Sequence, residues 1–87
     1  MTDIVGKTAL ITGAGGGFGR HMVQQFRAAG SKLVLTDVSE EALSAANDDA
    51  GNDLQASVAL DLATEEGCDA IAELCTSHDL IPDILVN

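Results

Sequence analysis

Apolar residues along the chain form short continuous runs, separated by stretches in which they recur every three or four positions. The runs predict strands at residues 8–12, 32–38, 55–62 and 84–87. The helical spacing predicts helices over residues 17–29, from a Ser39 cap to about residue 47, and after a Thr64 cap. Gly30 ends the first helix, and residues 47–53 are predicted to be a polar loop.

Two of these helices have an apolar side that is expected to pack on a sheet. The residues on it in the first helix are Phe18, Met22, Phe26 and Ala29, and those in the third helix are Cys68, Ile71, Ala72 and Cys75.

Alternating strands and helices, with strands that are apolar almost throughout, predict a parallel sheet covered by helices on both faces. The fold class is then α/β, a Rossmann-type doubly wound sheet that runs β-α-β-α-β-α-β in the strand order 3-2-1-4. Right-handed crossovers place the first two helices on one face and the third on the other. The chain reverses direction between strands 1 and 4, which predicts a ligand crevice at their carboxyl ends.

A glycine-rich loop at residues 12–19 reads TGAGGGFG and lies between the first predicted strand and the first predicted helix. At such a junction a helix N-terminus can hold a pyrophosphate, because no Cβ keeps the ligand at a distance. We interpret Gly13 as the tight turn and Gly19 as the contact between helix and sheet. The residues expected to approach the phosphates are Gly15, Gly16 and Gly17, and Phe18 completes the candidate cofactor-binding loop.

Asp37 lies at the end of the second predicted strand, where an acid accepts hydrogen bonds from both ribose hydroxyls of an adenosine. A 2′-phosphate would meet a like charge there, at a cost of roughly 1–4 kcal/mol near a surface. No Arg or Lys lies in the glycine loop or directly after Asp37 to offset this repulsion. The sequence therefore predicts NAD rather than NADP as the cofactor.

Charge and composition exclude several classes of partner. The 87 residues carry a net charge of −10, and their 4 basic residues all precede residue 33. So acidic a surface repels nucleic acid and anionic lipid. No apolar run is long enough to span a bilayer, and no signal peptide is recognisable.

The cysteines are expected to be reduced and to hold no metal. On one helix, Cys68 and Cys75 would lie about 10 Å apart along the axis, too far for a disulfide. Reduced thiols fit a cytoplasmic protein. Neither cysteine has partners at the spacing of metal ligands, so no metal site is predicted.

Taken together, these motifs resemble the classical branch of the short-chain dehydrogenase/reductase family. TGAGGGFG is similar to the family signature TGxxxGxG, and Asp37 follows it at the matching distance. Asp61 and Leu62 resemble the family's acid–hydrophobic pair beside the adenine. PDILVN, at residues 82–87, resembles the strand that leads into the NNAG motif, with Asn87 as its first Asn. Gly13, Gly16 and Gly19 also satisfy TGxxGxxG, typical of the extended branch, but PDILVN favours the classical one.

The resemblance implies hydride transfer between NAD and an alcohol or carbonyl substrate. The family's catalytic Ser and Tyr-x-x-x-Lys pair follow the NNAG motif, and this sequence contains no Tyr. We therefore expect residues 1–87 to be the N-terminal part of one NAD(P)-binding Rossmann domain, which supplies cofactor binding and no catalytic residue. The parent enzyme is expected to be a homo-oligomer.

Two alternatives stay open at this point. A family member could bind NAD as a sensor without catalysing a reaction, and the part of the domain after NNAG would decide that. A different doubly wound nucleotide binder, such as a methyltransferase, would also carry an acid after its second strand. Neither TGxxxGxG nor PDILVN is expected in such a protein.

Overall fold

The computed structural model describes residues 4–87, which alternate between strands and helices. The elements in chain order are β1 (Thr8–Ile11), α1 (Gly17–Ala28), β2 (Lys32–Asp37), α2 (Glu40–Ala50), the 3-10 turn η1 (Gly51–Asp53), β3 (Leu54–Ala59), α3 (Glu65–Ser77) and β4 (Ile84–Val86).

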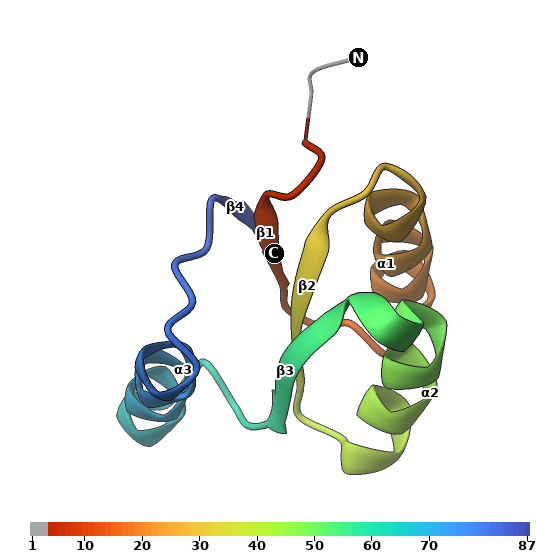
Figure 1. Ribbon diagram of the computed structural model, residues 1–87. Coiled ribbons are helices and arrows are strands. Elements are labelled where there is room, and N and C mark those ends of the chain that lie inside the picture. Colours follow the sequence, from red (N-terminus) through yellow and green to blue (C-terminus); the bar gives the residue numbers. More distant parts are fainter. Residues whose placement is uncertain (1–3) are drawn as a thin grey trace.

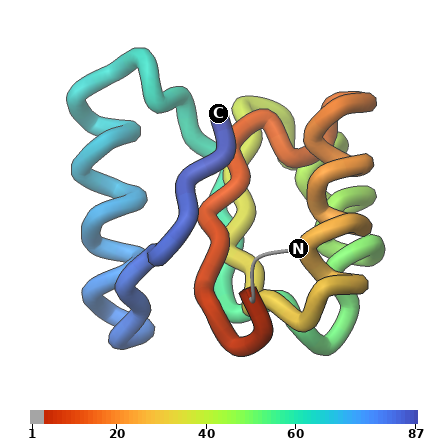
Figure 2. The backbone as a smooth tube through the Cα atoms, turned by 90° about the horizontal axis from the view of Figure 1, so that it is seen from above, coloured from red at the N-terminus to blue at the C-terminus, as the bar shows by residue number. Residues whose placement is uncertain are grey.

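The strands form one parallel sheet in the order β3-β2-β1-β4. Ala9 of β1 pairs with Leu33 on one side and with Ile84 on the other. Helices α1 and α2 cover one face of the sheet and α3 lies on the other (Figure 1). The view from above shows the same two layers flanking the strands (Figure 2). The predicted Rossmann-type topology is confirmed.

The core lies between the sheet and the α1–α2 layer. Side chains alternate between the two faces of a strand, so every second residue of β1 and β2 points toward these helices. The fully buried strand residues of this cluster are Ala9, Ile11, Leu33 and Leu35, and the helix residues packed on them include Val23, Leu43, Ala46 and Ala50.

The predicted apolar side of α1 is wrong at its first residue. Phe18 is 69% exposed, and the buried residues of α1 are Gly19 and Val23. Met22 and Phe26 pack against the core as predicted. The difference arises because the buried side of the first turn is taken by the small Gly19, which packs against the backbone of Gly13 and Ala14, and the neighbouring Phe18 then points outward.

The polar loop predicted over residues 47–53 is instead the end of α2 followed by η1. Ala50 is fully buried against the core, and the Arg27 guanidinium donates a hydrogen bond of 2.9 Å to the Asp49 carbonyl. These contacts with α1 hold the extra turn. The helix ends where Gly51 takes a φ of +56°.

Helix α3 buries less of its surface than predicted. Ile71 and Cys75 are half-buried, whereas Cys68 and Ala72 are exposed and Gly67 is the buried residue of the helix. The helix contacts chiefly β3, so most of its predicted apolar side is left partly open. Within residues 4–87, no helix is both long enough and apolar enough to cross a membrane.

Candidate functional site

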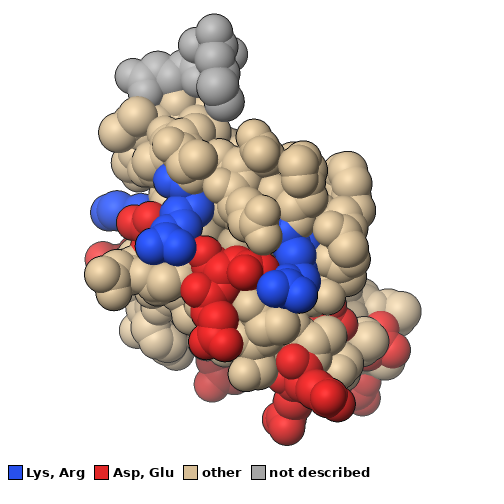
Figure 3. Space-filling model, turned by 90° about the vertical axis from the view of Figure 1, so that its right-hand side faces the viewer, with Lys and Arg blue, Asp and Glu red and all other residues tan. Residues whose placement is uncertain are grey.

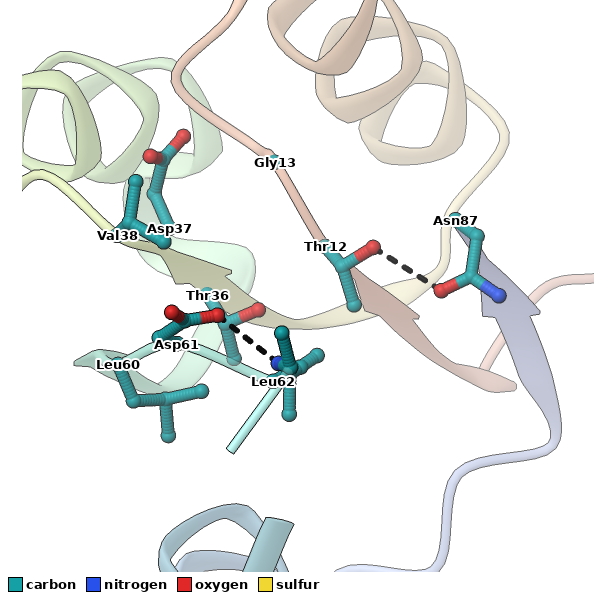
Figure 4. A pocket seen from close by; sticks show the side chains of 10 residues that line it. Thr12, Gly13, Thr36, Asp37, Val38, Leu60, Asp61, Leu62 and Asn87 are labelled. Carbon is teal, nitrogen blue, oxygen red and sulfur yellow. Dashed lines mark hydrogen bonds between the residues drawn. The ribbon is translucent and has the colours of Figure 1, made fainter. Parts of the chain in front are cut away.

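A cleft of about 260 Å³ lies at the carboxyl edge of the sheet. Its lining comes from the carboxyl ends of the four strands and the residues just beyond them, namely Thr12, Gly13, Thr36, Asp37, Val38, Leu60, Asp61, Leu62, Ala63 and Asn87. In Figure 4, Thr12 and Asn87 lie on one side of the cleft, and the segment from Leu60 to Leu62 lies on the other. The predicted residues Gly13, Asp37, Asp61, Leu62 and Asn87 are thus brought together.

The glycine-rich loop leaves β1 and folds back against the end of β2. Gly13 takes a φ of +61°, in the left-handed region that glycine adopts readily, and starts the turn. The Ala14 N–H then donates to the Thr36 carbonyl at 3.0 Å, and the Gly16 N–H donates to the Gly13 carbonyl at 3.1 Å. The loop therefore reaches α1 in one defined path.

The glycines of the loop differ in what surrounds them. A Cβ on Gly19 would overlap the Gly13 carbonyl oxygen, and a Cβ on Gly15 would overlap the backbone of Ala42 in α2. A Cβ on Gly17 would meet no protein atom within 4 Å. Of these three glycines, only Gly17 leaves free space toward solvent.

The contacts of Gly19 and Gly15 show why each position requires a glycine. Gly19 packs α1 against its own loop rather than directly on the sheet. Gly15, which we expected to approach the phosphates, has no room for a side chain because α2 lies against it. The sequence could not reveal this contact, since Ala42 is far from Gly15 along the chain.

The N-terminus of α1 lacks the caps found on the other two helices. Its N-cap is Gly16, without a side-chain hydrogen bond and without an acid in the first turn. Within residues 4–87, no group accepts from the N–H groups of Gly17, Phe18 and Gly19. These donors, at the positive end of the helix dipole, are suited to an anion.

By contrast, α2 and α3 both satisfy their own N-terminal donors. Ser39 accepts from the Ala42 N–H at 3.2 Å, and Thr64 accepts from the Gly67 N–H at 3.0 Å. Each helix also carries two acidic residues in its first turn. The N-termini of α2 and α3 are therefore less suited to an anion than that of α1, which has free N–H donors within the described residues and no acid in its first turn.

Asp37 connects the cleft with the glycine-rich loop. Its Oδ2 accepts from the Gly15 N–H at 2.8 Å, and its Oδ1 accepts from the Ser39 N–H at 3.2 Å. In Figure 4 the side chain rises from the end of β2 beside the loop. Because each carboxylate oxygen has a second acceptor position, Asp37 can still accept hydrogen bonds from a ligand.

Apolar side chains form a slot beside Asp37. Leu60 and Leu62 are half-buried on one wall, and Val38 is 71% exposed. Asp61 between the two leucines turns back on its own segment and accepts from the Ala63 N–H at 2.9 Å. Val38 and Leu60 were not singled out from the sequence, although their place directly beyond strand ends could have indicated them.

Thr12 and Asn87 close the far side of the cleft. The Thr12 hydroxyl lies 3.2 Å from the Asn87 Oδ1 and 3.3 Å from the Val86 carbonyl, so its one proton is shared between them (Figure 4). The contact joins the ends of β1 and β4. Within residues 4–87, no three His, Cys, Asp or Glu side chains are gathered as a metal site would require.

Comparisons with known proteins agree with this geometry. The model of the short chain dehydrogenase family matches residues 7–87. A short chain dehydrogenase/reductase, dpmpG, of Macrophomina phaseolina is 34% identical over 99% of this chain and 51% of its own length. The 3-oxoacyl-[acyl-carrier-protein] reductase FabG of Rickettsia bellii is 35% identical over 85% of this chain and 31% of its own. The chain thus spans about half, or less, of these relatives.

Solved structures show the same likeness. A 3-ketoacyl-(acyl-carrier-protein) reductase from Brucella melitensis, complexed with NADH, has a TM-score of 0.85 and 36% identity, covering 94% of this chain and 34% of that one. A short chain dehydrogenase/reductase from Burkholderia phymatum, in complex with NAD, has a TM-score of 0.82 and 35% identity. The match covers 98% of this chain and 31% of that one. On its sequence, its sheet order and these likenesses, the chain belongs to the short chain dehydrogenase family.

Proposed function

We propose that the protein is an NAD-dependent oxidoreductase, and that residues 1–87 hold the adenosine diphosphate half of the cofactor. The observation that carries the proposal is the open N-terminus of α1, whose free N–H groups lie beside a cleft that ends in the Asp37 carboxylate. A dinucleotide needs an anion site and a ribose acceptor side by side. When bound, the nicotinamide would supply or accept a hydride.

The residues of the site fit each part of that ligand. The N–H groups of Gly17, Phe18 and Gly19 would bind the pyrophosphate, and the open space at Gly17 lets it approach. Asp37 would accept from the adenosine ribose hydroxyls. The apolar slot made by Val38, Leu60 and Leu62 would take the adenine, with Asp61 at its rim.

Charges around Asp37 support NAD over NADP. A 2′-phosphate would be repelled by the carboxylate, and the base nearest to the loop in sequence, Arg20, is already bound to Asp49 at 2.7 Å. The two solved relatives described above hold NADH and NAD.

The substrate is proposed from the family resemblance alone, as an alcohol or carbonyl compound. The sequence holds no Tyr, so the acid/base residue that the family resemblance implies is not supplied by residues 1–87. What these residues contribute is binding and orientation of the cofactor. A cytoplasmic, homo-oligomeric parent enzyme, of which they form the N-terminal part, also stays a proposal that rests on the sequence.

Calorimetric titration of the full-length protein with NAD tests the proposal. Gly17→Val should eliminate measurable NAD binding, because a branched side chain would fill the space left for the pyrophosphate. The fold should survive, since no protein atom lies within 4 Å of the added Cβ.

Ala28→Val is the matched control, because it places the same side chain at an exposed position near the other end of α1. It should bind NAD as the wild type does. Wild-type protein that fails to bind NAD, or a Gly17→Val variant with unchanged affinity, would overturn the proposal.

A further inference from the structure

We propose that Asp37 is also a positioning residue for the phosphate-binding loop, so that it strengthens cofactor binding even where it meets no ribose hydroxyl. The inference rests on the proposed function and assigns a second task to the same carboxylate. It is drawn from the hydrogen bond of 2.8 Å that the Gly15 N–H donates to the Asp37 Oδ2.

One carboxylate joins two backbone segments that meet only in the folded protein. Oδ2 accepts from Gly15, in the loop after β1, and Oδ1 accepts from Ser39, the N-cap of α2. Hydrogen bonds from an amide to an ionised carboxylate are shorter and stronger than those between neutral groups. Asp37 therefore fastens the glycine-rich loop to the start of α2.

Packing at the same place leaves Gly15 little freedom to shift toward α2. The backbone of Ala42 lies directly against Gly15, and the Ala42 N–H is held by the Ser39 hydroxyl. The preceding residue, Ala14, is held by the Thr36 carbonyl at 3.0 Å. Within residues 4–87, Asp37 is the one acceptor of the Gly15 N–H and so limits movement away from α2.

The N–H groups that would bind phosphate lie just beyond this anchored point. Between Gly15 and the first helical N–H groups, the Gly16 N–H donates to the Gly13 carbonyl, and the Gly16 carbonyl accepts from the Arg20 N–H as the first hydrogen bond of α1. If Gly15 is released, the loop gains alternative conformations. Binding of an anion must then order the loop, and the entropy lost in doing so weakens the affinity. Preorganisation of this kind raises affinity without any new contact.

Two adenine nucleotides separate the positioning role from the ribose role. ADP offers Asp37 its ribose hydroxyls, whereas 2′,3′-dideoxy-ADP keeps the pyrophosphate and lacks them. Both are titrated into the full-length protein and into Asp37→Ala and Asp37→Asn. The two variants are equally neutral, but Asn keeps an oxygen that can accept from the Gly15 N–H.

If Asp37 positions the loop, Asp37→Ala should bind 2′,3′-dideoxy-ADP about three- to tenfold more weakly than Asp37→Asn does. In the ligand-free proteins, the Gly15 amide should exchange with solvent fastest in Asp37→Ala and more slowly in Asp37→Asn. Asp69→Asn removes one charge from an exposed position on α3 and should leave that exchange rate unchanged.

Equal affinities of the Ala and Asn variants for 2′,3′-dideoxy-ADP, with weakened ADP binding in both, would assign Asp37 to the ribose alone and overturn the inference. Unchanged exchange of the Gly15 amide in Asp37→Ala would overturn it without any ligand. Failure of the wild type to bind ADP would instead count against the proposed function. Should Asp37→Ala fail to fold, Asp37→Asn is compared with the wild type, and its Gly15 amide should exchange faster because a neutral oxygen accepts more weakly than a carboxylate. Equal exchange rates in these two proteins would then overturn the inference.

Discussion

The proposed preference for NAD should depend on a single side chain, that of Asp37. In the full-length protein, kcat/KM with NAD should exceed that with NADP by roughly ten- to a thousandfold, because the carboxylate repels a 2′-phosphate. Arg20 does not relieve the repulsion while Asp49 binds its guanidinium. Steady-state kinetics with both cofactors measure the ratio, which Asp37→Ala should shrink. NADP used as well as NAD would contradict this.

Gly17 and Gly19, two residues apart in the loop motif, should differ in how much stability one added methyl group costs. A Cβ on Gly19 would overlap the Gly13 carbonyl, so Gly19→Ala should lower the free energy of unfolding by about 1–3 kcal/mol or more. Gly17→Ala meets open space and should change it by less than about 1 kcal/mol. Urea denaturation of both full-length variants gives the comparison. Similar losses in the two would show that the loop repacks around Gly19.

At the residue scale, the sequence predicts positions that follow from the end of a strand, and it does not predict contacts that depend on remote packing. Gly13 and Asp37 could be placed in the cleft because both lie at the carboxyl end of a strand in a parallel sheet, and such ends meet at one edge. The contact of Gly15 with Ala42 follows from how α2 packs on the loop, and no residue near Gly15 in the sequence indicates that packing. The bond from Gly15 to Asp37 was missed for the same reason.

The order of strands and helices was predictable from the alternation of apolar runs, but their ends were set by contacts between elements. Helix α2 extends to Ala50 because that residue is buried and because α1 binds the preceding turn through Arg20 and Arg27. Local composition around residues 47–53 is polar and predicts a loop. Tertiary contacts outweigh such local preferences, which amount to a few tenths of a kcal/mol per residue.

Helices α1 and α2 are joined at the surface by an ion pair whose effect should depend on pH. Arg20 donates to both carboxylate oxygens of Asp49, at 2.7 and 3.3 Å, and this hydrogen bond lowers the pKa of Asp49 from its ordinary 3.8. Figure 3 views this side of the molecule and shows basic side chains lying against acidic ones. Stability from a lowered carboxyl pKa is present above the unfolded value and is lost as pH falls through the folded one.

Asp49→Asn should therefore lower the Tm of the full-length protein at pH 7, by at most about 2–4 °C because Arg20 is 44% exposed and the pair is screened. The difference from the wild type should shrink as the pH falls below 3.8, the ordinary pKa of Asp49. Glu73→Gln, an exposed acid on α3, controls for the change in net charge. A difference that persists undiminished in acid would show that the pair is not its cause.

The molecule as a whole has one well-packed layer and one sparse layer. On the α1–α2 side the sheet is sealed by fully buried residues such as Ile11, Leu33 and Val23. On the other side α3 contacts mainly β3, and Leu85 of β4 is 61% exposed. Topology predicted the unequal number of helices on the two faces. How much of the sparse face one helix covers depends on its docking, which the sequence does not encode locally.

Residues 1–87 made as a separate polypeptide should consequently self-associate and unfold at low temperature without sharp cooperativity. A parallel sheet requires both faces covered, and here β4 is an edge strand carrying an exposed leucine, which invites pairing with another chain. Sedimentation and thermal unfolding measure both properties, and Leu85→Thr, which keeps strand propensity while removing apolar surface, should reduce association. A monomer with a sharp transition at high temperature would contradict the folding argument.

The same polypeptide should not oxidise any alcohol, since it contains no Tyr to exchange the proton. Turnover of an alcohol above background, in a preparation free of host enzymes, would contradict this prediction.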